Sequence, residues 1–168
     1  MAQALVPLKD LVAAKSRLSG VLSPAERRSL AQAMVEDVLA LSSAPVILSH
    51  GGLKGVCDTE RNLSDALMKR FASNGGLIGI GYWDAAVCDA SPEGIVRSIR
   101  YAIDLLGVDH VALGSDYDGA VHAPFDTSEL SVLTEVMLQS GFSEEEMRKV
   151  LGENAKHFLL ENLPGNIL

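Results

Sequence analysis

Three short apolar runs decide the fold of this chain: PVILS at residues 45–49, LIGIGY at 77–82 and HVALG at 110–114. They are too apolar for surface strands, and short runs bounded by glycine or proline are typical of buried strands. Segments with apolar residues at helical spacing separate them. Strands that alternate with helices are joined by crossovers and therefore run parallel. The sequence thus predicts an α/β fold.

Further elements extend this alternation on both sides. Residues 4–8 (ALVPL) are a fourth apolar run, and Pro7 predicts a strand that is short or lies at an edge. Capping boxes at Ser23 and Ser143 mark two helix starts, and Asn62 is expected to cap another helix. The expected helices cover residues 24–42, 63–73, 92–106, 126–140 and 144–162.

Four parallel β-α units are half the number that closes a TIM-type barrel. As a flat sheet, they would form a small open structure with two edges. As a half-barrel, they would expose an apolar inner face and both edge strands. We therefore expect residues 1–168 to form a single domain, a partial barrel completed by self-association into a homodimer or a higher oligomer.

The composition argues against two classes of partner. The formal net charge is -8, from 22 acidic and 14 basic residues. Nucleic acid and anionic membrane surfaces require a basic face, so neither is an expected partner. The sequence has no apolar run near the ~20 residues of a membrane span, and its start lacks a signal-peptide pattern. The expected protein is soluble and cytoplasmic.

The two cysteines, Cys57 and Cys88, form no CxxC pair, which excludes a zinc knuckle. A disulfide between them stays open, but two buried thiols are favoured. Neither cysteine has a histidine near it in sequence that would activate it as a nucleophile.

Polar side chains follow the ends of the three apolar runs, at the edge where α/β proteins bind ligands. His50 follows the first run, Trp83 and Asp84 follow the second, and Asp116 and Asp118 follow the third. Imidazole and carboxylate groups bind Zn²⁺ or Mn²⁺, and an aspartate there can also transfer a proton. The pattern predicts a metal site at this edge.

Simpler interpretations compete with the metal site. A histidine after a strand is commonly a hydrogen-bonded loop residue, and Asp-x-Asp-Gly is a common turn. His122, in the loop after Asp118, is a further candidate ligand. His110 begins a strand, at the wrong end for this site, and is expected to be structural. His157 is expected on the surface of the last helix.

Four motifs, PVILSHGGLKGVCDTERNLSD, NGGLIGIGYWDAAVC, VDHVALGSDYDGAV and GFSEEEMRKVLGENAKHFL, resemble in order and spacing the C-terminal part of membrane (renal) dipeptidases. That family consists of zinc hydrolases with a barrel fold. The resemblance covers residues 45–164. It implies that His50 binds zinc, that Arg61 contacts the substrate carboxylate, and that Asp116 is the catalytic proton carrier.

The resemblance also shows what this sequence lacks. In the family, a His-x-Asp pair on the first strand, a metal-bridging glutamate on a middle strand and another histidine upstream of the one matching His50 complete the site. The corresponding upstream segment here, SLAQAMVEDVL, has no histidine. One inherited ligand and the acid/base remain, so we expect that dipeptide hydrolysis by the family's own mechanism is lost.

Residues 4–41 resemble a different family, the 2-phospho-L-lactate guanylyltransferases, in which a PxK…AKSRL loop lies at the nucleotide site. The matching residues here are Lys9, Lys15 and Arg17. A solvated basic loop is the favoured interpretation of these three, since the rest of that fold is missing. The sequence therefore predicts a chimera, guanylyltransferase-like over 1–43 and dipeptidase-like over 44–168, with a fusion junction near 41–45.

Two functions of different class follow from these observations. The first is a metal-dependent hydrolase, using zinc or manganese, with low or promiscuous activity on ester, amide or phosphotriester bonds of a small molecule. Its expected metal ligands are His50, Asp116, Asp118 and His122, with a second copy of the chain completing the site. The alternative is an inert structural chimera in which His50 and Asp116 are relics.

Overall fold

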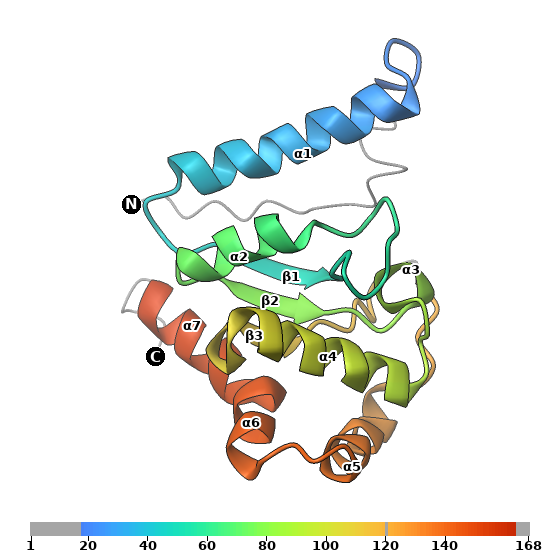
Figure 1. Cartoon of the computed structure of the whole chain (residues 1–168), viewed down its shortest axis with the longest axis vertical. Helices are drawn as coiled ribbons and strands as arrows, with labels where there is room; N and C mark the ends of the chain where they lie inside the picture. The colour runs from blue at the N-terminus through green and yellow to red at the C-terminus, as the bar shows by residue number, and fades with distance from the viewer. Residues whose placement is uncertain (1–17, 120, 164–168) are drawn as a thin grey trace.

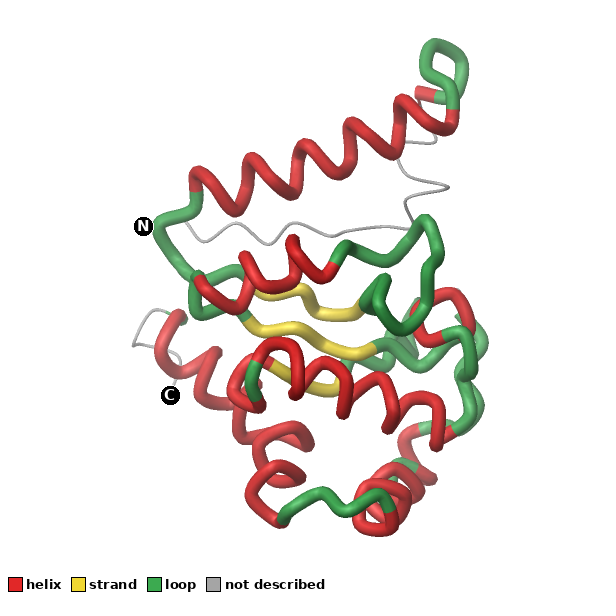
Figure 2. Tube along the Cα trace, in the orientation of Figure 1, coloured by secondary structure: helices red, strands yellow, loops and turns green. Residues whose placement is uncertain are grey.

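The three apolar runs form a parallel sheet. Strands β1 (Ile47–Gly51), β2 (Leu77–Ile80) and β3 (Val111–Leu113) lie in the order β1-β2-β3. Figure 2 shows them side by side, with helices around them. This arrangement confirms the predicted α/β fold and the parallel direction of the strands.

The computed structural model describes residues 18–119 and 121–163. The predicted strand at residues 4–8 lies outside the described residues, as do Lys9, Lys15 and Arg17. The described sheet therefore accounts for three of the four expected β-α units.

Helices α1 (Pro24–Leu41), α2 (Asp65–Ser73) and α4 (Pro92–Leu106) match the predicted ranges closely. The capping box at Ser23 is formed, because its hydroxyl accepts from the Glu26 amide at 3.3 Å and its own amide donates to the Glu26 carboxylate at 2.8 Å. Helix α2 is capped by the side chain of Ser64. The prediction that Asn62 caps this helix is wrong.

Helices α2 and α4 lie over one side of the sheet in Figure 1. Leu67 and Phe71 of α2 and Ile95 and Ile99 of α4 belong to the same buried cluster as Ile78 of β2. Each of these side chains is at most 4% exposed. Burial of these apolar side chains is the main force that holds the sheet and the helices together.

The C-terminal part is more segmented than the two helices, over 126–140 and 144–162, that the sequence predicts. Two short elements, α3 (Asp84–Val87) and η2 (Val108–His110), lie earlier in the chain. The C-terminal part consists of η3 (Thr127–Glu129), α5 (Ser131–Gln139), α6 (Glu144–Arg148), the π-helical turn η4 (Lys149–Glu153) and α7 (Asn154–Asn162). The capping box at Ser143 is confirmed. Asn154 donates to the carbonyl oxygens of Val108 and Val111 at 2.7 and 2.8 Å, which ties the last helix to the start of β3.

Cys57 and Cys88 are joined in a disulfide. The expectation of two buried free thiols is therefore wrong. The two residues are 31 positions apart in sequence, and they meet because one follows β1 and the other follows β2, which are neighbours in the sheet.

No helix among the described residues is long and apolar enough to cross a membrane. The predicted completion of a half-barrel by self-association concerns more than one chain and stays a prediction, as does the cytoplasmic location. In the described sheet, β1 and β3 are the two edge strands.

Candidate active site

The side chains of His50 and Asp116 meet at the carboxyl edge of the sheet. His50 lies within β1, and Asp116 follows β3. The His50 Nε2 atom is 3.8 Å from the Asp116 Oδ1 atom, and the two side chains are 29% and 15% exposed. The two residues that the sequence singled out first are thus in contact, and both remain accessible to a small ligand.

Two glycines make this contact possible. Adjacent strands lie about 4.8 Å apart, so β1 and β3, on either side of β2, would be roughly 10 Å apart in a flat sheet. A Cβ atom added at Gly79 would lie 2.2 Å from the Ser49 carbonyl oxygen, and one added at Gly114 would lie 2.6 Å from the same oxygen. Because no side chain intervenes, the sheet curls and β3 approaches β1.

His50 is oriented by its neighbour in sequence. The Ser49 hydroxyl is 2.9 Å from the His50 Nδ1 atom, so one ring nitrogen has a hydrogen-bond partner and Nε2 faces Asp116. A neutral imidazole held in this way can bind a metal ion or accept a proton through Nε2. Sequence reasoning missed Ser49, because a serine within a strand gives no signal of such a role.

Asp116 has a left-handed backbone conformation, with φ 58°. Few residues other than glycine adopt this conformation, although aspartate tolerates it. The Gly119 amide donates to the Asp116 carbonyl oxygen at 2.8 Å, which closes a tight turn. A Cβ atom added at Gly119 would lie 2.5 Å from the Asp116 Oδ1 atom, so the carboxylate occupies space that only glycine leaves open.

Trp83 connects Arg61 to His50, because its ring contacts both side chains. The Arg61 guanidinium carbon is 4.4 Å from the centre of the Trp83 ring, a cation–π contact. The rings of His50 and Trp83 meet edge to face, with centroids 6.1 Å apart. The third predicted site residue is therefore linked to His50 by an indole that the sequence placed at a strand end without assigning it a role.

Three links join the loop after β1 to the segment after β2, a fourth lies within that loop, and we call the four together the loop clamp. They are the Cys57–Cys88 disulfide, a hydrogen bond from the Thr59 hydroxyl to the Ala85 carbonyl at 2.7 Å, and two hydrogen bonds from Asn62. The Asn62 amide donates to the carbonyl oxygens of Cys57 and Ala86, both at 2.8 Å, and the side chain is 2% exposed. The loop clamp fixes the backbone on both sides of Arg61.

Aromatic side chains pack beneath the loop of Asp116. Tyr82 is 1% exposed and contacts the rings of Tyr117 and Phe125, with centroids 5.8 and 5.5 Å apart. Burial raises the pKa of both tyrosines above the ordinary value, which keeps their hydroxyls neutral. The three rings therefore pack together beneath the loop of Asp116.

The other histidines and acidic residues of the prediction have different outcomes. Asp118 and His122 are exposed, and no group of three or more His, Cys, Asp or Glu residues within 18–119 and 121–163 is arranged to hold a metal ion. His110 hydrogen-bonds the Gly76 carbonyl at 2.9 Å, so its structural role is confirmed. His157 is exposed on α7, as predicted.

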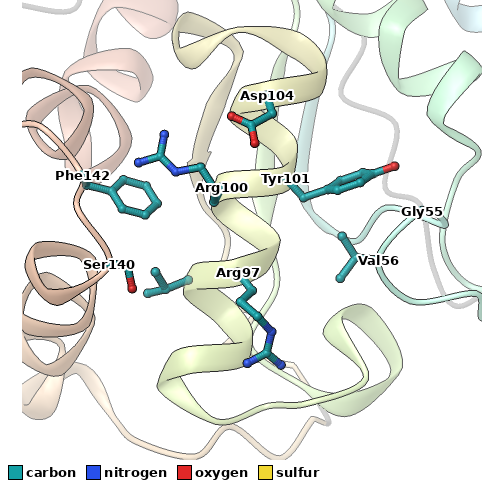
Figure 3. Close-up of a pocket in the computed structure, with 9 residues that line it drawn as sticks. Gly55, Val56, Arg97, Arg100, Tyr101, Asp104, Ser140 and Phe142 are labelled. Atoms are coloured by element: carbon teal, nitrogen blue, oxygen red, sulfur yellow. The ribbon is translucent and has the colours of Figure 1, made fainter.

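A separate groove of about 450 Å³ crosses the outer face of α4, between Val56 and Phe142 (Figure 3). The two guanidinium groups that line it already have carboxylate partners. Arg97 pairs with Asp89 at 2.7 Å and Arg100 pairs with Glu146 at 2.6 Å. The Arg100 guanidinium lowers the pKa of Glu146 to about 2. The strand ends, where His50 and Asp116 meet, therefore remain the candidate site.

The match to known proteins agrees with this geometry. A sequence model of the membrane dipeptidase family, peptidase family M19, matches residues 25–161. The chain belongs to this family. The matched range begins upstream of the expected fusion junction near residues 41–45, and the predicted guanylyltransferase-like segment gains no support from it.

Two curated relatives are fungal dipeptidases. Dipeptidase ataJ of Aspergillus terreus is 34% identical over 131 residues, which are 73% of this chain and 32% of the relative. Dipeptidase tcpJ of Claviceps purpurea is 29% identical over 160 residues, which are 91% of this chain and 37% of the relative. The chain thus spans about a third of the length of these relatives.

Two solved metallopeptidase structures share the fold of about three quarters of this chain. A metallo peptidase from Rhodobacter sphaeroides, liganded with a phosphinate mimic of the dipeptide L-Ala-D-Ala, gives a TM-score of 0.69 at 30% identity over 74% of this chain and 38% of that chain. The dipeptidase AC, a metallo peptidase of family M19, gives 0.69 at 31% identity over 75% and 39%. This chain therefore shares the fold of a part of these metallopeptidases.

Proposed function

We propose that this chain is a metal-dependent hydrolase, with zinc as the expected metal, that acts on amide or ester bonds of small molecules with a free carboxylate. Its activity is expected to be low or promiscuous and to extend to phosphotriesters. The convergence of His50, Asp116, Trp83 and Arg61 at one edge of the sheet is the observation that supports this function. Membership of a metallopeptidase family supports the class of reaction.

Each of three residues has a defined part in this proposal. His50 offers Nε2 as a metal ligand, because Ser49 occupies its other ring nitrogen. Asp116 holds or transfers a proton at one carboxylate oxygen, while its Oδ1 atom, next to His50 Nε2, can bind the same metal. Arg61 binds the substrate carboxylate through its guanidinium, whose planar donors match two carboxylate oxygens.

The described residues provide part of the ligand set that a zinc ion needs. Two ligands of a tetrahedral zinc ion lie about 3.3–3.5 Å apart, close to the 3.8 Å between His50 Nε2 and Asp116 Oδ1. A zinc site needs three or four protein ligands, and the described residues bring together no third one. We propose that a second copy of the chain supplies the remainder, with Asp118 and His122 as exposed candidates.

Metal analysis combined with a hydrolysis assay tests the proposed function. We expect purified protein to bind zinc, to hydrolyse a dipeptide or an activated ester, and to lose this activity in chelator. His50→Ala is expected to lower both bound zinc and turnover. Asp116→Asn is expected to lower turnover by about 100-fold or more, since a proton carrier is lost, and to lower bound zinc much less, since the amide oxygen stays beside His50 as a ligand. His157→Ala, an exposed histidine of α7, is the matched control.

The same experiment distinguishes the proposed hydrolase from the alternative, an inert structural protein. Protein that contains no transition metal, and that hydrolyses nothing faster in zinc than in chelator, would identify His50 and Asp116 as relics. Light scattering with and without zinc tests the second copy: a monomer that retains full zinc binding would contradict completion of the site by self-association.

A further inference from the structure

Trp83 occupies the space between the two functional halves of the candidate site. The Arg61 guanidinium carbon lies over its indole, 4.4 Å from the ring centre, and the His50 ring meets it edge to face, with centroids 6.1 Å apart. We propose that Trp83 is a positioning residue, which sets where the Arg61 guanidinium lies relative to His50 and Asp116. This inference deepens the proposed function and rests on it for its consequence on ligand binding.

The burial of Trp83 indicates that it acts through its neighbours. The side chain is 5% exposed, so it offers a bound molecule almost no surface of its own. Its backbone is fixed at both sides, because it follows β2 and is the residue before helix α3. An indole held in this way is a rigid support for a long and otherwise mobile arginine side chain.

The backbone of Arg61 does not depend on Trp83. The adjacent residue Asn62 is hydrogen-bonded to Cys57 and Ala86, and Thr59 is hydrogen-bonded to Ala85. Removing the indole is therefore expected to shift the Arg61 guanidinium from its present place, while the loop clamp holds the loop. For this reason, an effect of Trp83 on the Arg61 side chain can be measured separately from an effect on the backbone of the loop.

The consequence concerns ligands with a free carboxylate. If Arg61 binds that carboxylate, a guanidinium that Trp83 no longer holds must be ordered when the ligand arrives, which weakens binding. The loss is expected to be about 3- to 10-fold, the range of one cation–π contact. A ligand in which an amide replaces the carboxylate does not use Arg61, and its affinity is expected to stay unchanged.

Nuclear magnetic resonance of Trp83→Leu and Trp83→Phe tests the proposal. The Arg61 Nε–Hε signal, assigned with Arg61→Lys, is expected to be shifted by the indole ring current in the parent protein. In Trp83→Leu the signal should lose this ring-current shift, and Trp83→Phe should restore part of it. Phe142→Leu is the matched control, because Phe142 is stacked on another guanidinium, that of Arg100, at 3.7 Å.

Binding of diglycine and diglycinamide, measured in chelator to prevent turnover, completes the test. Weaker binding of diglycine alone in Trp83→Leu, partly recovered in Trp83→Phe and unaffected in Phe142→Leu, supports the positioning role. An Arg61 signal that does not change in folded Trp83→Leu overturns it. If the parent protein fails to bind diglycine, the carboxylate role in the proposed function fails, while the Arg61 signal still decides whether Trp83 positions the guanidinium.

Discussion

The two sides of the candidate site are held by different kinds of interaction. On one side, the loop clamp joins the loop after β1 to the segment after β2 by a disulfide and by one hydrogen bond each from Thr59 and Asn62, and a second hydrogen bond from Asn62 closes the loop itself. On the other side, the loop after β3 presents Asp116 from a strained turn. The chain has two cysteines, and the loop clamp contains both.

This difference suits one side of the site to substrate binding and the other to proton transfer. Arg61 and Trp83 lie on the covalently closed side, where a fixed position suits recognition of a carboxylate. Asp116 lies on the side closed by a turn and by aromatic packing, where small movements cost little. A group that transfers a proton must approach and leave a substrate atom, and such a loop suits that role.

The largest expected effect comes from the disulfide. Replacing both Cys57 and Cys88 with serine is expected to lower the free energy of unfolding by about 3–4 kcal/mol, because the crosslink closes a loop of 31 residues in the unfolded chain. Urea denaturation measures the change, and reduced parent protein should behave like the double variant. A variant as stable as the oxidised parent would show that the hydrogen bonds alone hold the loop clamp.

Asn62→Ala is expected to have the next largest effect. The substitution leaves the carbonyl oxygens of Cys57 and Ala86 without their donor in a buried position, at a cost of about 2–3 kcal/mol. Asn162→Ala, which removes one hydrogen bond from a half-buried side chain on α7, is the matched control and should cost about 1 kcal/mol or less. Equal losses in the two variants would contradict the central place of Asn62 in the loop clamp.

The strands and helices of the fold could be predicted from the sequence, whereas the contacts that join one loop to another could not. The positions of the described strands and of several helix starts were predicted to within a few residues, because apolar runs and capping residues such as Ser23 and Ser143 act locally. The cap of α2 was misassigned to Asn62, because Asn62 and Ser64 are both good caps and only packing decides between them.

The site was predictable where its residues follow strand ends. His50 and Asp116 were expected together, since parallel strands end at one edge of the sheet, and they are 3.8 Å apart. The contact of Arg61 with Trp83 and the disulfide could not be predicted, because each joins residues more than twenty positions apart through the course of two loops. The exposed positions of Asp118 and His122 likewise depend on the course of a loop.

Gly119→Ala tests the second side of the comparison. An added methyl group would collide with the Asp116 carboxylate and is expected to move it away from His50. Because Gly119 is exposed, the free energy of unfolding should change by about 1 kcal/mol or less, while zinc binding at His50 weakens. Gly20→Ala, where an added Cβ meets nothing within 4 Å, is the control. Unchanged zinc binding in Gly119→Ala would show that Asp116 is not confined by this glycine.

Tyr117→Phe is expected to have the smallest effect and to distinguish the two sides most directly. The Tyr117 hydroxyl is buried and has no hydrogen-bond partner among the described residues, whereas the buried amide of Asn62 donates twice. A buried hydroxyl without a partner contributes nothing that its removal would cost, so the free energy of unfolding should stay within about 0.5 kcal/mol of the parent or rise. The edge-to-face contact with Tyr82 is kept by phenylalanine. Thermal and urea denaturation beside Asn62→Ala measure the contrast. A loss of about 1 kcal/mol or more would mean that the hydroxyl has a bridging water, and that the loop of Asp116 is fixed by polar contacts as the loop clamp is.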